Sequence, residues 1–264
     1  MFTRITHPTD LSAGGQPAFA LALALSLRTR ASLRAVHVDR GAPSWEAWPH
    51  ATELLARWGH DLSDPGIVIQ KLHIESSLVW PSLLGDLVDH PPSLLVLATS
   101  ARDGWSRWTT HNVAESLVRR GRVPSLVLPH GAPSLVDITT GAFRLERVLM
   151  PVSREPSAAR ARGLVDGLAA LSDAHTWVRE IVIGDEQPPP FRTGPPPEGM
   201  SVDKERLPEQ PIVEAILDQV HTMSPELLVL TSRGHDGPLD ALFGSTAEQV
   251  LRRAGVPVLI VPAD

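Results

Sequence analysis

The stretch with the clearest chemical potential runs from Thr231 to Glu248 and reads TSRGHDGPLDALFGSTAE. Gly234 and Gly244 stand ten positions apart, and a Gly-Ser-Thr step then leads into AEQVLRRAG, which has the composition and spacing of a helix. Glycines let an anion approach the backbone closely, and the free N–H groups at the start of a helix attract phosphate. The spacing therefore favours a phosphate loop in front of a helix.

The end of this stretch has a second explanation that involves no ligand. Ser245 is followed three residues later by Glu248. This spacing is typical of a capping box, in which the two side chains satisfy N–H groups at the start of a helix. A helix that is only capped and a helix that also binds phosphate both explain these residues, and the local pattern leaves the two alternatives open.

Composition narrows the class of protein. The chain has 264 residues and a net charge of −6 without a block of like charges, so neither nucleic acid nor an anionic membrane is indicated as a partner. It contains no cysteine, which excludes thiol catalysis, disulfides and cysteine-ligated metal. The 11 histidines lack metal-binding spacings and no Gly-x-Ser-x-Gly elbow occurs, so we predict no metal site and no catalytic residue.

The apolar run AFALALALSL, from Ala18 to Leu27, is too short to span a bilayer. It begins well inside the chain and is followed by Arg28 and Arg30, which is unlike a signal peptide with its small-residue cleavage site. We predict a buried helix here, in a soluble protein.

An internal repeat dominates the organisation of the chain. Leu94–Pro129 and Leu227–Pro262 align without a gap, and 14 of the 36 positions are identical. Each copy contains an apolar four-residue strand, a polar loop with Asp-Gly, a helix with paired arginines, and a second apolar strand after Val-Pro. A gapless match of this length indicates duplication.

Short apolar strands alternate with helices in both halves. In the first half we expect strands in FTRITHP, SLRAVHVDR, GIVIQKLHI and at Leu94, and helices near residues 17–30, 43–59 and 80–88. In the second half we expect a strand in LERVLMP, a helix from about Ser157 and a strand in WVREIVIGD. The alternation predicts an α/β fold of two tandem doubly wound domains, each with a five-stranded parallel sheet, over residues 1–135 and 142–264. The linker is expected within residues 130–141.

The second half also carries EQPPPFRTGPPPEGM, which begins at Glu186. So many prolines argue against a helix or a central strand, and we predict an exposed loop over residues 187–198. A passive insertion is the simpler interpretation, and recognition of the segment as polyproline is the alternative.

Two motifs stand where strands of each half end. The first strand ends in Pro-Thr-Asp-x-Ser, and a late strand is followed by Gly-x2-Gly-x9-Gly-Ser/Thr spacing and by Val-Pro-Val-Leu-Ile-Val-Pro. This combination resembles the universal stress protein family, and the resemblance covers nearly the whole chain, twice over. It implies tandem domains with the adenine nucleotide alpha-hydrolase-like fold. Many family members bind ATP at this loop, whereas others lack its glycines and bind no nucleotide.

Carried over residue by residue, the resemblance implies an ATP site, with Mg²⁺, in the second half only. Thr231 stands at the first glycine position and Ser153 at the acidic position after the first strand, so two positions depart from the family pattern. The implied cofactor-binding residues are Pro151, Ser153, Thr231, Arg233, Gly234, Gly244, Ser245 and Thr246.

The first half shows the opposite combination. Asp10 keeps the acidic position, but the loop positions hold Ala98, Ala101, His111 and Asn112. Side chains at these positions leave less room for a triphosphate, and we expect no ATP there.

The resemblance favours a regulatory or binding module in the stress response over an enzyme, although slow ATP hydrolysis with Asp236 as the base stays open. The alternative function is a nucleotide-free scaffold or protein-interaction module of the same fold. The apolar last strands, Val123–Pro129 and Val256–Pro262, are expected to pair within the chain and form a pseudo-dimer, because apolar sheet edges invite pairing. Further homodimerisation is left open, and a cytoplasmic location is expected.

Overall fold

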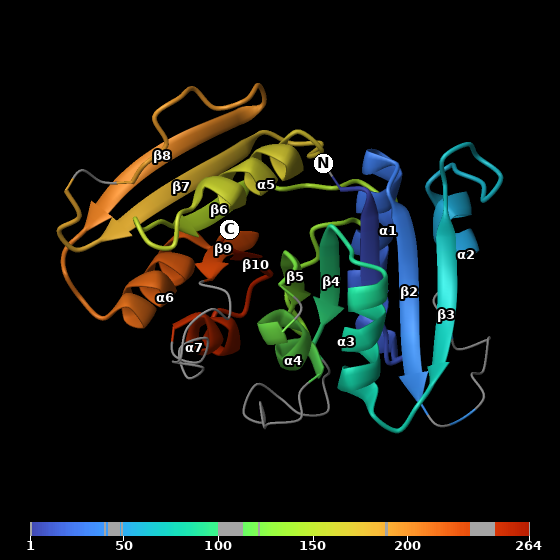
Figure 1. Ribbon diagram of the computed structural model, residues 1–264. Coiled ribbons are helices and arrows are strands. Elements are labelled where there is room, and N and C mark those ends of the chain that lie inside the picture. The colour runs from blue at the N-terminus through green and yellow to red at the C-terminus, as the bar shows by residue number, and fades with distance from the viewer. Residues whose placement is uncertain are drawn as a thin grey trace. The chain divides into compact units, whose positions relative to one another are not determined.

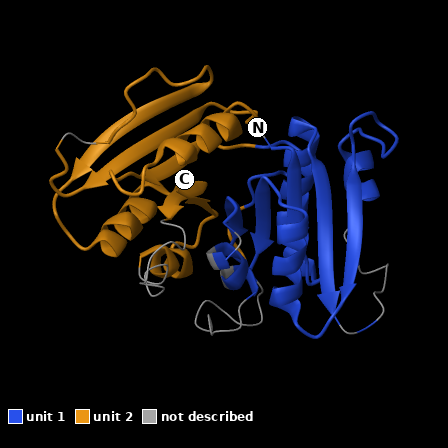
Figure 2. Cartoon of the chain, viewed as in Figure 1, with its two compact units in different colours: residues 1–130, 134–143 blue, residues 131–133, 144–264 orange. Residues whose placement is uncertain are grey.

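The computed structural model describes residues 2–39, 41, 48, 50–99, 113–120, 122–187, 190–232 and 246–263. The chain divides into two compact units (Figure 2). Unit 1 comprises residues 1–130 and 134–143, and unit 2 comprises residues 131–133 and 144–264. Each unit is an α/β fold, so the chain is a tandem pseudo-dimer in the sense that one fold occurs twice in one polypeptide.

Unit 1 is built on a parallel sheet (Figure 1). Its strands are β1 (Arg4–Pro8), β2 (Ser32–Asp39), β3 (Ile69–Glu75), β4 (Leu94–Ala98) and β5 (Ser125–Leu128). They lie in the order β3-β2-β1-β4-β5, so β1 is central and the strand order reverses beside it. This is the doubly wound arrangement that the alternating pattern predicts.

The helices of unit 1 follow the predicted positions. They are η1 (Ala13–Gly15), α1 (Gln16–Thr29), α2 (Ala51–Arg57), α3 (Val79–Asp89) and α4 (Val113–Arg120). Every residue of α1 from Ala18 to Ser26 is buried, and the helix contacts β1, β2 and β4, which confirms the predicted buried helix. Within the described part of the chain, no helix combines the length and apolarity needed to cross a membrane. The helix expected over 43–59 is shorter in the structure, because α2 begins at Ala51 and the described residues Trp48 and His50 lie outside it. Trp48 precedes a proline, and the residue before a proline is disfavoured in the helical region. Residues 42–47 lie outside the described part of the chain.

Unit 2 repeats the same plan. Its strands are β6 (Arg147–Pro151), β7 (Thr176–Ile183), β8 (Met200–Leu207), β9 (Leu227–Ser232) and β10 (Val258–Pro262), and its helices are α5 (Ala159–Ala169), α6 (Ile212–Met223) and α7 (Thr246–Arg253). The strands are parallel, in the order β10-β9-β6-β7-β8. The sequence did not locate β8, because its centre is a run of four charged residues, 203–206. Charged side chains are tolerated there because β8 is the outer strand of the sheet beside β7.

The proline-rich segment of unit 2 makes hydrogen bonds and an ion pair with strand β7 and helix α5. The buried carboxylate of Glu180, on β7, accepts hydrogen bonds from Arg162 Nε of α5 at 2.7 Å and from the backbone N–H of Arg192 at 2.8 Å. Arg162 also donates to the carbonyl of Pro190, and Arg192 pairs with Asp166 of α5. Residues 193–196 are exposed as predicted, but the segment around Arg192 is a packed part of unit 2.

Residues 134–143, which overlap the expected linker, belong to unit 1. The indole Nε1 of Trp58 donates to the carbonyl of Ile138 at 3.0 Å. Gly141 has a φ of +74°, and a Cβ atom at this position would lie 2.7 Å from the Trp58 ring. This residue therefore has two reasons to be glycine, its left-handed backbone and the indole beside it.

We expect Gly141→Ala to destabilise unit 1 by about 2–4 kcal/mol, because left-handed strain costs roughly 1–2 kcal/mol and displacement of the ring adds about as much again. Gly59→Ala is the matched control, since Gly59 has a φ of +81° and no neighbour within 4 Å of a built Cβ. Urea unfolding of both variants measures the difference. An equal decrease in the free energy of unfolding in the two variants would show that the contact with Trp58 does not contribute to the effect.

Candidate functional site

The candidate site lies at the carboxyl edge of the unit 2 sheet. All strands of this sheet are parallel, so β9, β6, β7 and β8 end at the same edge, at Ser232, Pro151, Ile183 and Leu207. The chain winds from β6 to β7 and β8 on one side and reaches β9 and β10 on the other. Ligands of open α/β sheets bind in the crevice at such a reversal, which here lies between the ends of β6 and β9.

Four of the implied site residues can be placed. Pro151 ends β6, Ser153 follows it by two residues, and Thr231 is the penultimate residue of β9, so these three lie at the reversal of strand order. Thr246 begins α7, on the far side of the loop that leaves β9. The other four implied residues, Arg233, Gly234, Gly244 and Ser245, lie outside the described residues, as does Asp236.

The two hydroxyls at the reversal differ in their hydrogen bonding. The Oγ of Ser153 donates to the carbonyl of Pro156 at 3.5 Å, within its own turn. The Oγ1 of Thr231 is shielded from water and has no hydrogen-bond partner among the described residues. A buried hydroxyl without a partner is costly, so Thr231 offers hydrogen-bonding capacity at the edge of the site.

Helix α7 follows the loop and is eight residues long. Glu248 lies in its first turn and forms an ion pair with Arg252, one turn further on. Arg253 reaches α6, where its NH1 atom lies 3.1 Å from Glu214 Oε1. The helix is thus held by its own ion pair and by α6. The predicted capping box has its other residue, Ser245, outside the described part of the chain.

Glu186 lies at the same edge of the sheet and was not singled out by sequence reasoning. It lies three residues beyond β7, and its Oε1 accepts a hydrogen bond from the backbone N–H of Arg154 at 3.3 Å, in the loop after β6. Its own carbonyl accepts from Arg206 NH2 at 3.1 Å. A glutamate next to a run of prolines gives no local signal, because both of its partners are remote in sequence.

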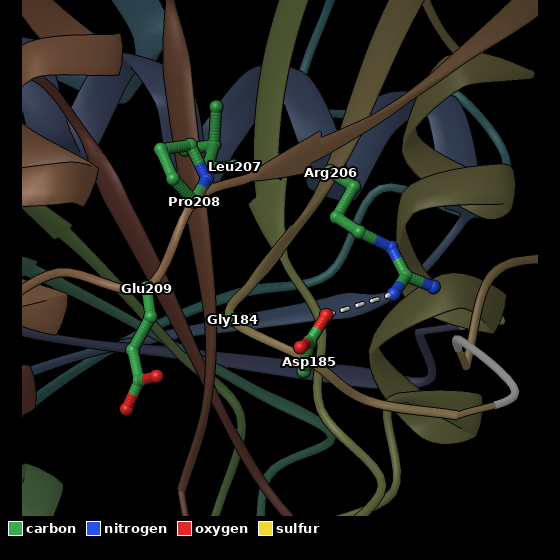
Figure 3. A pocket seen from close by; sticks show the side chains of 6 residues that line it. All are labelled: Gly184, Asp185, Arg206, Leu207, Pro208 and Glu209. Atoms are coloured by element: carbon green, nitrogen blue, oxygen red, sulfur yellow. Dashed lines mark ion pairs between the residues drawn. The ribbon is translucent and has the colours of Figure 1, made fainter.

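A hollow of about 290 Å³ lies between the ends of β7 and β8 (Figure 3). Arg206 and Asp185 point toward one another across it, with Arg206 NH1 3.7 Å from Asp185 Oδ1, whereas the side chain of Glu209 points away from this pair. The lining residues are Gly184, Asp185, Arg206, Leu207, Pro208 and Glu209. The hollow lies at the same carboxyl edge of the sheet, at the ends of the two outer strands β7 and β8.

At the corresponding edge of unit 1, polar side chains at the ends of β2 and β3 make internal hydrogen bonds. His37 Nδ1 donates to the Thr9 carbonyl at 2.8 Å, and Asp39 faces the Nε2 atoms of His73 at 2.8 Å and His37 at 3.0 Å. Hydrogen bonds with His73 and His37 lower the pKa of Asp39 to about 2, and the bond with His73 contributes the larger share. Asp10, which keeps the family's acidic position, accepts a hydrogen bond from the Ser12 backbone N–H at 3.0 Å.

The family model described as the Universal stress protein family matches residues 1–129 and 200–262. The chain belongs to the universal stress protein family. The resemblance drawn from the strand-end motifs is thereby confirmed, and the two matched regions fall in the two units. Among curated proteins, no significant match to this universal stress protein is found.

Solved structures support the tandem fold. A universal stress protein from Archaeoglobus fulgidus is similar over 98% of this chain and 96% of its own, with 17% identity and a TM-score of 0.64. A functionally unknown protein from Pseudomonas aeruginosa is similar over 100% of this chain and 93% of its own, with 14% identity and a TM-score of 0.70. Because both matches run over nearly the full length of both chains, the predicted fold of two tandem units is confirmed.

Proposed function

We propose that this universal stress protein is a regulatory or binding module that holds one adenine nucleotide, with Mg²⁺, at the carboxyl edge of unit 2. The observation that carries the proposal is the meeting of Pro151, Ser153 and Thr231 at the reversal of strand order. A parallel sheet offers its ligand site at this place. The unsatisfied hydroxyl of Thr231 supports the fit, because a ligand there supplies the missing partner.

The chain has residues suited to each part of such a ligand. The phosphates would be held by backbone N–H groups at the start of α7 and by the hydroxyl of Thr246, with Ser245 just before it. Gly234 and Gly244 would let the phosphates approach the backbone, and Arg233 would offset part of their charge. Bound nucleotide would stabilise unit 2 by mass action, by an amount that grows with the logarithm of its concentration above the dissociation constant.

One site per chain follows from the difference between the units. At the edge of unit 1, His37, Asp39 and His73 use their polar atoms on one another and on Thr9. Asp10 is likewise engaged within its own turn. Displacing these internal hydrogen bonds opposes ligand binding there, which favours unit 2 as the nucleotide-binding unit.

The alternative function is a nucleotide-free scaffold that contacts a protein partner. Its specific support is the exposure of apolar residues at both ends of α3, where Leu78 is 63% and Val88 is 72% exposed. The contacts of Arg192 with Glu180 and Asp166 make the proline-rich segment less suited to polyproline recognition, because a segment packed against its own unit is less accessible to a partner protein. Nucleotide that co-purifies with the protein, detected by mass spectrometry, would contradict the scaffold.

The assembly and the location of the protein belong to the same proposal. β5 and β10 end the strand order of their own units, and we retain the expectation that these apolar last strands pair within the chain. Sedimentation of the purified protein tests further homodimerisation. Fractionation of the source cells tests the cytoplasmic location. Comparing the amount of the protein in stressed and unstressed cells tests the role in the stress response.

Calorimetric titration with Mg-ATP tests the nucleotide site. We expect the wild type to bind and Gly244→Glu to bind at least about 100-fold more weakly, because its side chain brings bulk and negative charge into the phosphate path. His111→Glu is the matched control, since His111 occupies the equivalent repeat position in unit 1, and it should bind like the wild type. No binding by the wild type at millimolar ATP would overturn the proposal, as would equal losses in both variants.

A further inference from the structure

The carboxylate of Glu186 uses its two oxygens unequally. Oε1 accepts the hydrogen bond from the Arg154 N–H at 3.3 Å. Oε2 is shielded from water and has no hydrogen-bond partner among the described residues. An ionised carboxylate has acceptor sites on both oxygens, and leaving a shielded one unpaired costs free energy. Glu186 therefore retains one strong acceptor.

Two neighbours hold this acceptor at the carboxyl edge. The Arg154 N–H belongs to the loop after β6, one residue beyond Ser153, and it ties the Glu186 side chain to that loop. Arg206, near the end of β8, donates from NH2 to the Glu186 carbonyl at 3.1 Å and holds its backbone. The Val152 N–H donates to the Ile181 carbonyl at 2.9 Å, which sets the β6 loop against β7. The side chain of Glu186 is thus held by the loop after β6, and its backbone is held by Arg206 of β8.

Nearby polar groups do not take the same role. The Ser153 hydroxyl, which stands at the family's acidic position, is turned toward Pro156. The side chain of Asp185 is 95% exposed and faces Arg206 across the hollow. Of these three side chains, Glu186 is therefore the carboxylate that lies beside the loop after β6 and has one shielded oxygen that no described residue binds. The terminal torsion of a glutamate is soft, so the carboxylate can rotate at little cost.

We propose that Glu186 binds an O–H or N–H donor on the non-phosphate part of the ligand, a sugar hydroxyl or the amino group of the base. The inference rests on the proposed nucleotide binding and assigns this contact to a residue from the end of β7. A carboxylate and a neutral donor form a charge-assisted hydrogen bond, which is stronger than one to a serine hydroxyl. Glu186 thereby supplies the acidic contact that Ser153 lacks.

Glu186→Gln tests the inference with little change in shape. The amide oxygen can still accept from the Arg154 N–H, while an NH₂ group replaces the spare acceptor. We expect calorimetry to show about 10- to 100-fold weaker Mg-ATP binding, as for the loss of a charge-assisted hydrogen bond. Binding of inorganic tripolyphosphate should stay within about twofold of the wild type. Asp185→Asn is the matched control, and its Mg-ATP affinity should also stay within about twofold.

Two analogues identify the donor in the wild type. Weak binding of 2′,3′-dideoxy-ATP, with little further loss in Glu186→Gln, would assign the sugar hydroxyls. The same pattern with inosine triphosphate would assign the amino group. Equal Mg-ATP affinity of Glu186→Gln and the wild type would overturn the inference and leave the proposed function standing. A parallel loss of tripolyphosphate binding in Glu186→Gln would also overturn it. A wild type that binds neither Mg-ATP nor tripolyphosphate would refute the proposed function itself.

Discussion

Replacing Arg162 by methionine is expected to destabilise unit 2 by about 3–5 kcal/mol, the usual cost of removing one partner from a buried ion pair. The side chain of Glu180 is 1% exposed, and Arg162 binds both of its oxygens, from Nε at 2.7 Å and from NH2 at 3.2 Å. Without Arg162, the described residues leave Glu180 with only the Arg192 N–H at 2.8 Å. Urea unfolding of the variant measures the loss.

Two controls separate the buried charge from lost packing. The double variant Arg162→Met/Glu180→Met removes both charges and should recover most of the stability, because replacing a whole buried pair by apolar residues is often neutral. Arg253→Met removes an ion pair with Glu214 in which both side chains are about half exposed, at 3.1 Å, and should cost less than about 1 kcal/mol. A loss below about 1 kcal/mol for Arg162→Met alone would show that Glu180 finds another partner.

Lowering the pH is expected to destabilise unit 1 through His7. This residue is buried on β1, and burial lowers its pKa from 6.5 to about 4, although the hydrogen bond between Nδ1 and the Val96 carbonyl, at 2.9 Å, opposes the shift. The unfolded chain takes up a proton near pH 6.5, whereas the folded chain resists protonation until about pH 4. Stability is therefore lost as the pH falls through this window, by about 3 kcal/mol, and His7 contributes no further loss below it.

His7→Asn removes this titration and keeps an N–H donor for the Val96 carbonyl. Urea unfolding followed by circular dichroism between pH 7 and pH 4 should show a flatter stability profile for this variant than for the wild type. His175→Asn is the control, because His175 is exposed just before β7 and its replacement should leave the slope unchanged. A slope in His7→Asn equal to that of the wild type would show that other groups produce the acid sensitivity.

Some features of the fold were predictable because they depend on residues close together in the chain. The unbroken apolar run of α1 identifies a helix that is buried on every side. The gapless repeat identifies two copies of one α/β plan, since equal spacing of strands and helices produces equal topology. The repeat placed Thr231 at a strand end, and the strand expected in LERVLMP placed Pro151 at another. The topology brings these two strand ends to one edge.

Other features depended on partners that lie far apart in sequence. Strand β8 was missed because its charged centre carries no apolar alternation, and only its place at the sheet edge explains it. The proline-rich segment looked passive because nothing local relates Arg192 to Asp166 or to Glu180. These contacts depend on the packing of the segment against α5 and β7, which is a property of the folded unit.

The sequence by itself determined the family, the tandem plan and the strand ends at which a ligand would bind, because each depends on periodicity and on motifs along the chain. The tertiary structure decided which side chains retain hydrogen-bonding capacity there. Ser153 proved to be engaged with its own turn, whereas Glu186, 33 positions further on, has an oxygen beside the same loop that no described residue binds. Hydrogen bonding depends on distance and direction in space, and only the folded chain sets these for residues so far apart.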